Sequence, residues 1–328
     1  MWFDGGNVCM SVAAGDVCVS WVTAVIYLGA VVLVLAGVLG VLVVDARRTP
    51  TPSQAAMRAN RHATLASVVG VGVMASILAW MIGGSVLGSV PWRDGRVLAL
   101  LPALAGVSLL VAQAVGQLTW PQPSGVVREA ELSRRAVADV APGWPRRLVF
   151  AWAGAGVLLL VIFGLVADGP RTMIRRAGQY TQAIGPYPGW YYGVLIGSVM
   201  VVTVVATELV LRLIALRPAV VGVSAEWDLH LRRRSATHVT RGVQLVLALT
   251  TAGVLYAAGR VHQSLGPWWI ELDAGGHVAF GSPAQQYLGT GLMMLAVVVL
   301  VMGLVFTVVP VRRRQRNRPA PFAVAVPS

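Results

Sequence analysis

Residues 286–310 read QYLGTGLMMLAVVVLVMGLVFTVVP, a stretch of 25 residues without a charged side chain. Crossing the hydrocarbon core of a bilayer takes about 20 apolar residues when they form a helix. Six further long, mostly apolar stretches precede this one. They cover residues 21–44, 63–87, 97–118, 148–167, 191–214 and 242–261. The sequence therefore predicts an all-α polytopic membrane protein, a bundle of seven transmembrane helices.

The composition agrees with this fold class. Of the 328 residues, 56% are hydrophobic and 12% are charged, whereas about 25% charged residues is usual in soluble domains. The apolar runs are continuous rather than alternating, which favours helices over a β-barrel. We expect three parts: an extracytoplasmic N-terminal segment (1–20), the bundle (21–310) and a basic cytoplasmic tail (311–328).

The arginines predict the orientation of the bundle. All 26 basic residues are arginine, and 19 of them lie in segments 46–62, 119–147, 215–241 and 311–328, against five in the segments between. Cytoplasmic loops carry the excess of basic residues. We therefore expect an outer N-terminus and a cytoplasmic C-terminus in the cell membrane. Arg171, Arg175 and Arg176 oppose this rule.

A net charge of +13 suggests nucleic acid as the partner of a soluble protein. Here positive-inside topology already accounts for the charge. We expect the lipid bilayer as the partner, and no nucleic acid.

Two of the basic loops resemble each other. Residues 129–140 align without gaps with residues 228–239, 99 positions later, which suggests a parallel internal repeat. Each copy reads as a short amphipathic segment lying on the cytoplasmic leaflet, with Leu132, Val137 and Val140 toward lipid in the first copy. Its arginines would contact anionic lipid headgroups or a membrane or cytoplasmic protein partner. They are Arg134, Arg135, Arg233 and Arg234. The alternative is an ordinary positive-inside loop.

Polar side chains inside the predicted spans are the candidates for function. Glu208 lies inside the fifth span, and Arg212 follows at i+4 on the same helix face. Gln113 and Gln117 have the same spacing in the third span. These four residues predict either a polar pathway or, as the plainer alternative, a local ion pair and amide contacts that join helices.

The outer segments offer a disulfide and a weak metal candidate. Cys9 and Cys18 are the only cysteines, so one disulfide or two free thiols are the alternatives. Glu271, Asp273 and His277 are metal-binding residue types, but their spacing matches no metal motif. We therefore expect neither a metal nor a cofactor.

Motifs of membrane enzymes and nucleotide-binding proteins are missing. The chain has no His-Glu-x-x-His, no Gly-x-x-x-x-Gly-Lys-Ser/Thr and no pair of intramembrane aspartates. Without lysine it also has no residue for a Schiff base. We do not expect an enzyme.

The segment Trp120-Pro-Gln-Pro-Ser-Gly125, followed by Arg128-x-x-x-Leu132-x-Arg134-Arg135, resembles uncharacterised multi-pass membrane proteins of high-GC Gram-positive bacteria. The similarity covers about one fifth of the chain. It implies a bacterial cell-membrane protein and carries over no site residue. The polar groups inside the spans favour a permease-like or transport-accessory protein, because such groups are costly to keep without use. The alternative is a signalling or scaffolding protein that docks a partner on its arginine-rich loops.

Overall fold

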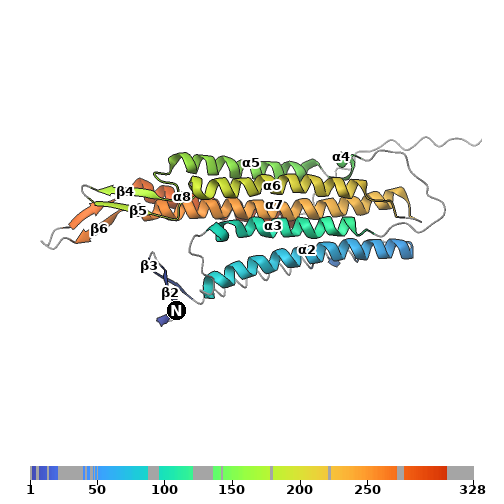
Figure 1. Ribbon diagram of the computed structural model, residues 1–328, viewed down its shortest axis with the longest axis horizontal. Helices are drawn as coiled ribbons and strands as arrows, with labels where there is room; N and C mark the ends of the chain where they lie inside the picture. Colours follow the sequence, from blue (N-terminus) through green and yellow to red (C-terminus); the bar gives the residue numbers. More distant parts are fainter. Residues whose placement is uncertain are drawn as a thin grey trace, which may run out of the picture.

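The computed structural model is an elongated bundle of nearly parallel helices with small hairpins at one end (Figure 1). The structure describes residues 2–4, 7–12, 15–20, 40, 43–44, 47, 49, 51–87, 96–120, 136–141, 143–177, 180–220, 223–271 and 277–308. We call the end where α2, α5 and α7 begin the arginine-rich end, and the opposite end, with strands β4–β7, the hairpin end.

Within the described residues, six helices are long and apolar enough to cross a membrane. They are α2 (Gln54–Leu87), α3 (Arg96–Leu118), α5 (Gly143–Val166), α6 (Trp190–Leu216), α7 (Ala225–Ser264) and α8 (Pro283–Val308). They confirm six of the predicted spans. The first predicted span, 21–44, lies outside the described residues except for helical positions 40, 43 and 44.

The chain is mostly helical, as predicted, but outside the spans it also forms short antiparallel strands that were not predicted. β1 (Trp2–Asp4), β2 (Asn7–Val12) and β3 (Gly15–Ser20) form one sheet. β4 (Met173–Ala177) pairs with β5 (Tyr180–Ile184), and β6 (Trp268–Glu271) pairs with β7 (His277–Phe280). The segments combine residues that favour strands with very short connections, such as Gly5-Gly6 and Gly178-Gln179, which are typical of hairpins.

Helix α7 begins 17 residues before the predicted span. The Ser224 hydroxyl caps the helix by accepting a hydrogen bond from the Trp227 backbone N–H at 3.3 Å. Glu226 and Asp228 lie in the first turn, where negative charge is favourable. The second predicted amphipathic segment, 228–239, is therefore not a separate helix on the membrane surface. It is the first part of α7.

The two copies of the suggested repeat fold differently. The described part of the first copy contains only the four-residue helix α4 (Val137–Val140), and Val140 is buried rather than facing lipid. Ala141 has an extended backbone (φ −91°, ψ 122°) and precedes Pro142, which disfavours the helical conformation at that position. The second copy has Arg241 in place of the proline, so α7 runs through without a break.

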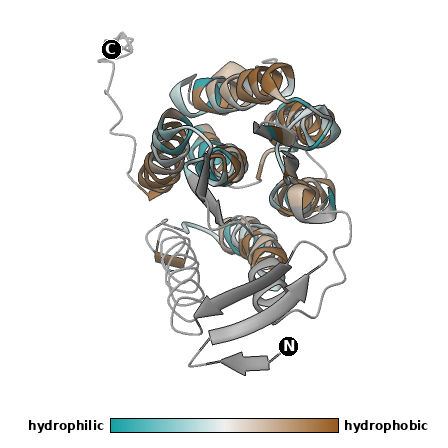
Figure 2. Cartoon of the chain, turned by 90° about the vertical axis from the view of Figure 1, so that its left-hand side faces the viewer, coloured by the Kyte–Doolittle hydropathy of each residue, from teal (hydrophilic) through white to brown (hydrophobic). Residues whose placement is uncertain are grey.

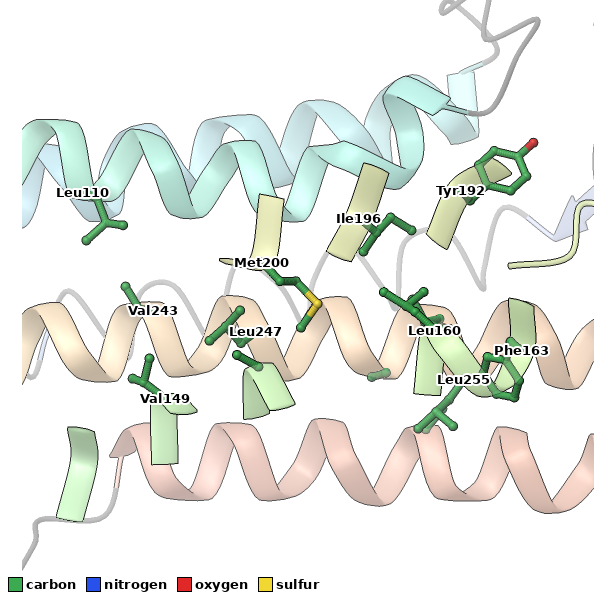
Figure 3. Close-up of a cluster of buried hydrophobic side chains, with 14 of the residues drawn as sticks. Leu110, Val149, Leu160, Phe163, Tyr192, Ile196, Met200, Val243, Leu247 and Leu255 are labelled. Atoms are coloured by element: carbon green, nitrogen blue, oxygen red, sulfur yellow. The ribbon is translucent and has the colours of Figure 1, made fainter. Parts of the chain in front are cut away.

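The core lies between the helices, and α7 is at its centre. α7 contacts α2, α3, α5, α6 and α8. Leu160, Met200 and Leu247 belong to the cluster of buried side chains that joins α5, α6 and α7 (Figure 3). Gly156 allows this close approach, because a Cβ there would collide with the side chains of Met200 and Thr251.

Many apolar side chains point outward. On α6 alone, Val194, Val201, Val202, Val205 and Leu209 are each more than half exposed, and Figure 2 shows apolar residues on the outer surfaces of the helices. A water-soluble protein does not expose apolar area on this scale. The architecture is that of a multi-pass integral membrane protein.

Candidate functional site at the arginine-rich end

Glu208 is held by a residue that the sequence analysis did not consider. Its two carboxylate oxygens accept hydrogen bonds from Nε and Nη2 of Arg146 on α5, at 2.7 and 2.8 Å. Both side chains are partly buried. Arg212, the partner suggested by the i+4 spacing, is exposed and has no ion pair within the described residues. The Glu208–Arg212 pair is therefore replaced by a bridge between two helices.

The two glutamines are buried, but within the described residues neither forms a hydrogen bond to Glu208. Gln113 donates to the Ser67 hydroxyl of α2 at 3.2 Å, and Gln117 accepts from Arg217 at 3.5 Å. Gln113 thus joins α3 to α2, and Gln117 joins α3 to the residue that follows α6, whereas Glu208 binds α5. The hydrogen bonds of the described residues do not join the four residues into one polar pathway.

Arg232 is among the most completely buried side chains, with 1% exposure. Its Nε donates to Asp228 Oδ2 at 2.7 Å, one turn earlier on α7. Its Nη1 and Nη2 donate to the backbone carbonyls of Ile214, Ala215 and Arg217 at 2.7–2.9 Å. These carbonyls lie at the C-terminal end of α6, where the helix has no further backbone N–H to donate to them. One guanidinium therefore caps α6 and attaches it to α7.

The predicted lipid- or partner-facing arginines have other roles. Arg234 is buried and donates from Nη1 to Asn60 Oδ1 at 2.7 Å and to the Thr49 hydroxyl at 3.2 Å, so its predicted exposure is wrong. Arg233 is half-buried and donates to the Asp139 carbonyl at 3.0 Å. Arg134 and Arg135 lie outside the described residues.

A small apolar core completes this end of the molecule. Leu231, on α7, packs with Ala59 and Ala63 of α2 and with Trp120, next to the half-buried Trp227. The Arg217 guanidinium carbon lies 3.9 Å from the centroid of the Trp120 ring, in cation–π contact. We call the first turns of α2 (54–63) and the first part of α7 (225–241), with this core between them, the platform.

The platform extends beyond the length that a membrane needs. With 40 residues at about 1.5 Å each, α7 is about 60 Å long, roughly twice the thickness of the hydrocarbon core. The charged residues of α7 lie mainly in its first half, 225–241. This half is therefore too rich in charge to suit the apolar layer of a membrane. The exposed side chains of the platform include Glu226 on α7 and, on α2, Met57, Arg58 and Arg61.

The hairpin end holds a second polar cluster. Tyr187 is fully buried; its hydroxyl lies 3.4 Å from Nε2 of His262, whose Nδ1 lies 2.6 Å from Gln285 Oε1. Burial raises the pKa of Tyr187 to about 12. Arg175 of β4 donates to the carbonyls of Ser264 and Gly266, and so caps the end of α7. This contact gives one of the arginines that oppose the positive-inside rule a structural role.

Some of the candidate residues predicted for the outer segments lie outside the residues that the structure describes. The register of β2 and β3 places Cys9 directly opposite Cys18. Their side chains lie outside the described residues, so a disulfide stays a prediction. The register also pairs Glu271 with His277 across β6 and β7. Asp273 lies outside the described residues.

Sequence reasoning missed Arg146, Asp228, Arg232 and Asn60. A signal was present for one pair, because Asp228 and Arg232 have the same i, i+4 spacing as Glu208 and Arg212. The partners of the other residues lie on different helices, and helix neighbours cannot be read from a single sequence. No protein-family model, curated protein or solved structure matches this chain.

Proposed function

We propose that this chain is a signalling or scaffolding protein of the cell membrane that docks an acidic cytoplasmic protein on its platform. The observation that supports the proposal is the way the platform is built. Buried Arg232 and Arg234 and the Leu231–Trp120 core fix it to the bundle. A rigid surface outside the apolar layer suits a docking role because little conformational entropy is lost on binding.

The chemistry of the exposed side chains favours an acidic partner. Arg58 and Arg61 are exposed one turn apart on α2, and Glu226 is the exposed acidic residue of the described platform. Basic surfaces of this kind attract acidic partners and increase the rate of encounter. Met57, which is 40% exposed and precedes Arg58 in the chain, provides an adaptable apolar contact beside them.

A photo-crosslinking amino acid tests the proposal when placed at Met57 and at Glu226, in turn. Val201 and Val205 on the outer face of α6 are the control positions, because they are exposed in the apolar zone. In inverted membrane vesicles we expect one protein adduct of the same size from both platform positions, weakened by high salt. We expect none from the control positions.

Charge reversal separates specific docking from general attraction. The R58E/R61E variant should lose the adduct, whereas R212E, at an exposed arginine on α6, should retain it. The proposal fails if the platform positions give only lipid adducts, or if R212E reduces the yield as much as R58E/R61E.

A permease-like or transport-accessory role is the second candidate, and one observation favours it. Gln244 of α7 is 1% exposed, and its amide nitrogen has no hydrogen-bond partner within the described residues. Leaving a buried amide without a partner costs about 1–3 kcal/mol of stability. A role in lining a polar route would explain why the residue is kept despite this cost. A cysteine at position 244, in a chain with Cys9 and Cys18 replaced by serine, tests access. Reaction with a membrane-impermeant thiol reagent favours transport, and protection argues against it.

A further inference from the structure

Two arginines from different elements meet on one tyrosine ring at the hairpin end. The guanidinium carbon of Arg96 lies 3.8 Å from the Tyr191 ring centroid, and that of Arg171 lies 5.6 Å from it. Arg96 is the first residue of α3, Arg171 precedes β4, and Tyr191 is in the first turn of α6. We propose that Arg96, Arg171 and Tyr191 bind the phosphate of an anionic phospholipid in the membrane leaflet at the hairpin end.

The backbone holds these side chains in place. The Tyr191 N–H donates to the Pro170 carbonyl at 3.0 Å, and the Tyr187 N–H donates to the Arg171 carbonyl at 2.9 Å. Gly189 allows the loop to approach α6 closely, because a Cβ there would lie 2.7 Å from the Pro170 oxygen. The loop that carries Arg171 is therefore fixed to the first turn of α6.

The charges around this ring favour an anion. Both arginines are exposed and lie closer together than the Debye length of about 10 Å in 0.1 M salt, so their repulsion is only partly screened. Asp168, three residues before Arg171, uses its Oδ2 atom to accept a hydrogen bond from the Ile174 N–H at 2.8 Å. A phosphate would relieve the repulsion, and guanidinium groups bind phosphate through two parallel hydrogen bonds.

The position of the cluster points to a lipid rather than to a soluble anion. Arg96 and Tyr191 lie where α3 and α6 begin, which is the depth of the headgroups if these helices cross the membrane. Trp190, beside Tyr191, is 45% exposed, and exposed tryptophans gather at this depth. This inference is independent of the proposed docking function, since it concerns the opposite end of the bundle.

Lipid enrichment tests the inference. The full chain is reconstituted in phosphatidylcholine nanodiscs with a minor fraction of phosphatidylglycerol, extracted mildly, and the co-purified lipids are measured by mass spectrometry. We expect phosphatidylglycerol to be enriched over the bulk. We expect about a tenfold weaker enrichment for each arginine removed, in R96Q and in R171Q. R212Q, at an exposed arginine of the opposite end, is the matched control and should keep the enrichment.

Conservative variants and a soluble probe make the test specific. Y191F should bind as the wild type does, whereas Y191L, without an aromatic ring, should bind less. If R96Q/R171Q does not fold, R96K/R171K keeps the charge and should still show reduced enrichment. Inorganic phosphate should not compete. The inference is overturned if R96Q/R171Q or its lysine counterpart retains full enrichment, if R212Q loses it equally, or if inorganic phosphate displaces the lipid.

Discussion

Arg232 and Asp228 form a buried ion pair on α7, with 2.7 Å between Nε and Oδ2, and the same guanidinium caps the last carbonyls of α6. One side chain thus joins the platform to the part of the bundle that crosses the membrane. Both groups are almost fully buried, so breaking the pair costs stability. We therefore expect the stability of the protein to depend on Arg232.

Replacing Arg232 with methionine should strongly destabilise the protein. The change leaves the Asp228 carboxylate buried without its ion-pair partner and leaves the α6 carbonyls without their donor. Removing one member of a buried pair typically costs about 3–5 kcal/mol. Thermal unfolding in detergent measures the loss. R233Q is the control, because Arg233 is only half-buried and donates to a single carbonyl; an equal loss in both variants would contradict the role of Arg232.

The Arg146–Glu208 bridge should couple α5 to α6. Since Arg146 is 38% exposed and Glu208 21% exposed, we expect a coupling energy of about 1 kcal/mol from a double-mutant cycle with R146Q and E208Q. R212Q should show no coupling to E208Q. The reverse result, coupling to Arg212 and none to Arg146, would restore the pair suggested by the sequence spacing.

Ionisation of Tyr187 should destabilise the hairpin end at high pH. Its pKa is raised from 10.0 to about 12 in the folded chain, so between these values the unfolded phenol loses its proton while the folded one keeps it. The protonated Tyr187 phenol therefore contributes fully to stability below pH 10, and this contribution is lost as the pH rises toward about 12. The fall in the unfolding temperature over this range should be smaller in Y187F than in the wild type, and an identical fall would count against the assignment.

Cys9 and Cys18 should form a disulfide when the protein is made in its membrane. Directly opposed residues of an antiparallel pair have Cα atoms about 4.5–5.5 Å apart, within the range that a disulfide bridges. A denatured, unreduced sample should take up no alkylating reagent, and a reduced one should take it up at both cysteines. Alkylation without reduction would show two free thiols.

The sequence predicted the spans well because continuous apolar length is a strong, local signal. It was less informative wherever a partner lies on another helix. The i+4 rule joined Glu208 to Arg212, but Arg146 of α5 donates to both carboxylate oxygens of Glu208. Similarly, Arg234 was predicted to be exposed because it is charged, whereas Asn60 of α2 provides a buried acceptor for it.

The hairpins and the start of α7 were missed for a different reason. Apolar content set the span edges, so no strands were expected beyond them, and residues 228–239 were predicted as a separate segment on the membrane surface. Ser224 followed by Glu226 and Asp228 is a helix start that was present in the sequence, and Gly5-Gly6 is a turn signal. Both are local patterns that a search beyond the apolar windows detects.

The docking account depends most directly on the platform facing the cytoplasm. In a chain with Cys9 and Cys18 replaced by serine, a cysteine at Glu226 reports on the platform and a cysteine at Ser282 reports on the hairpin end, since both positions are exposed. A membrane-impermeant maleimide is the probe. We predict labelling of S282C in intact cells, and of E226C only in inverted vesicles; labelling of E226C in intact cells would contradict the account.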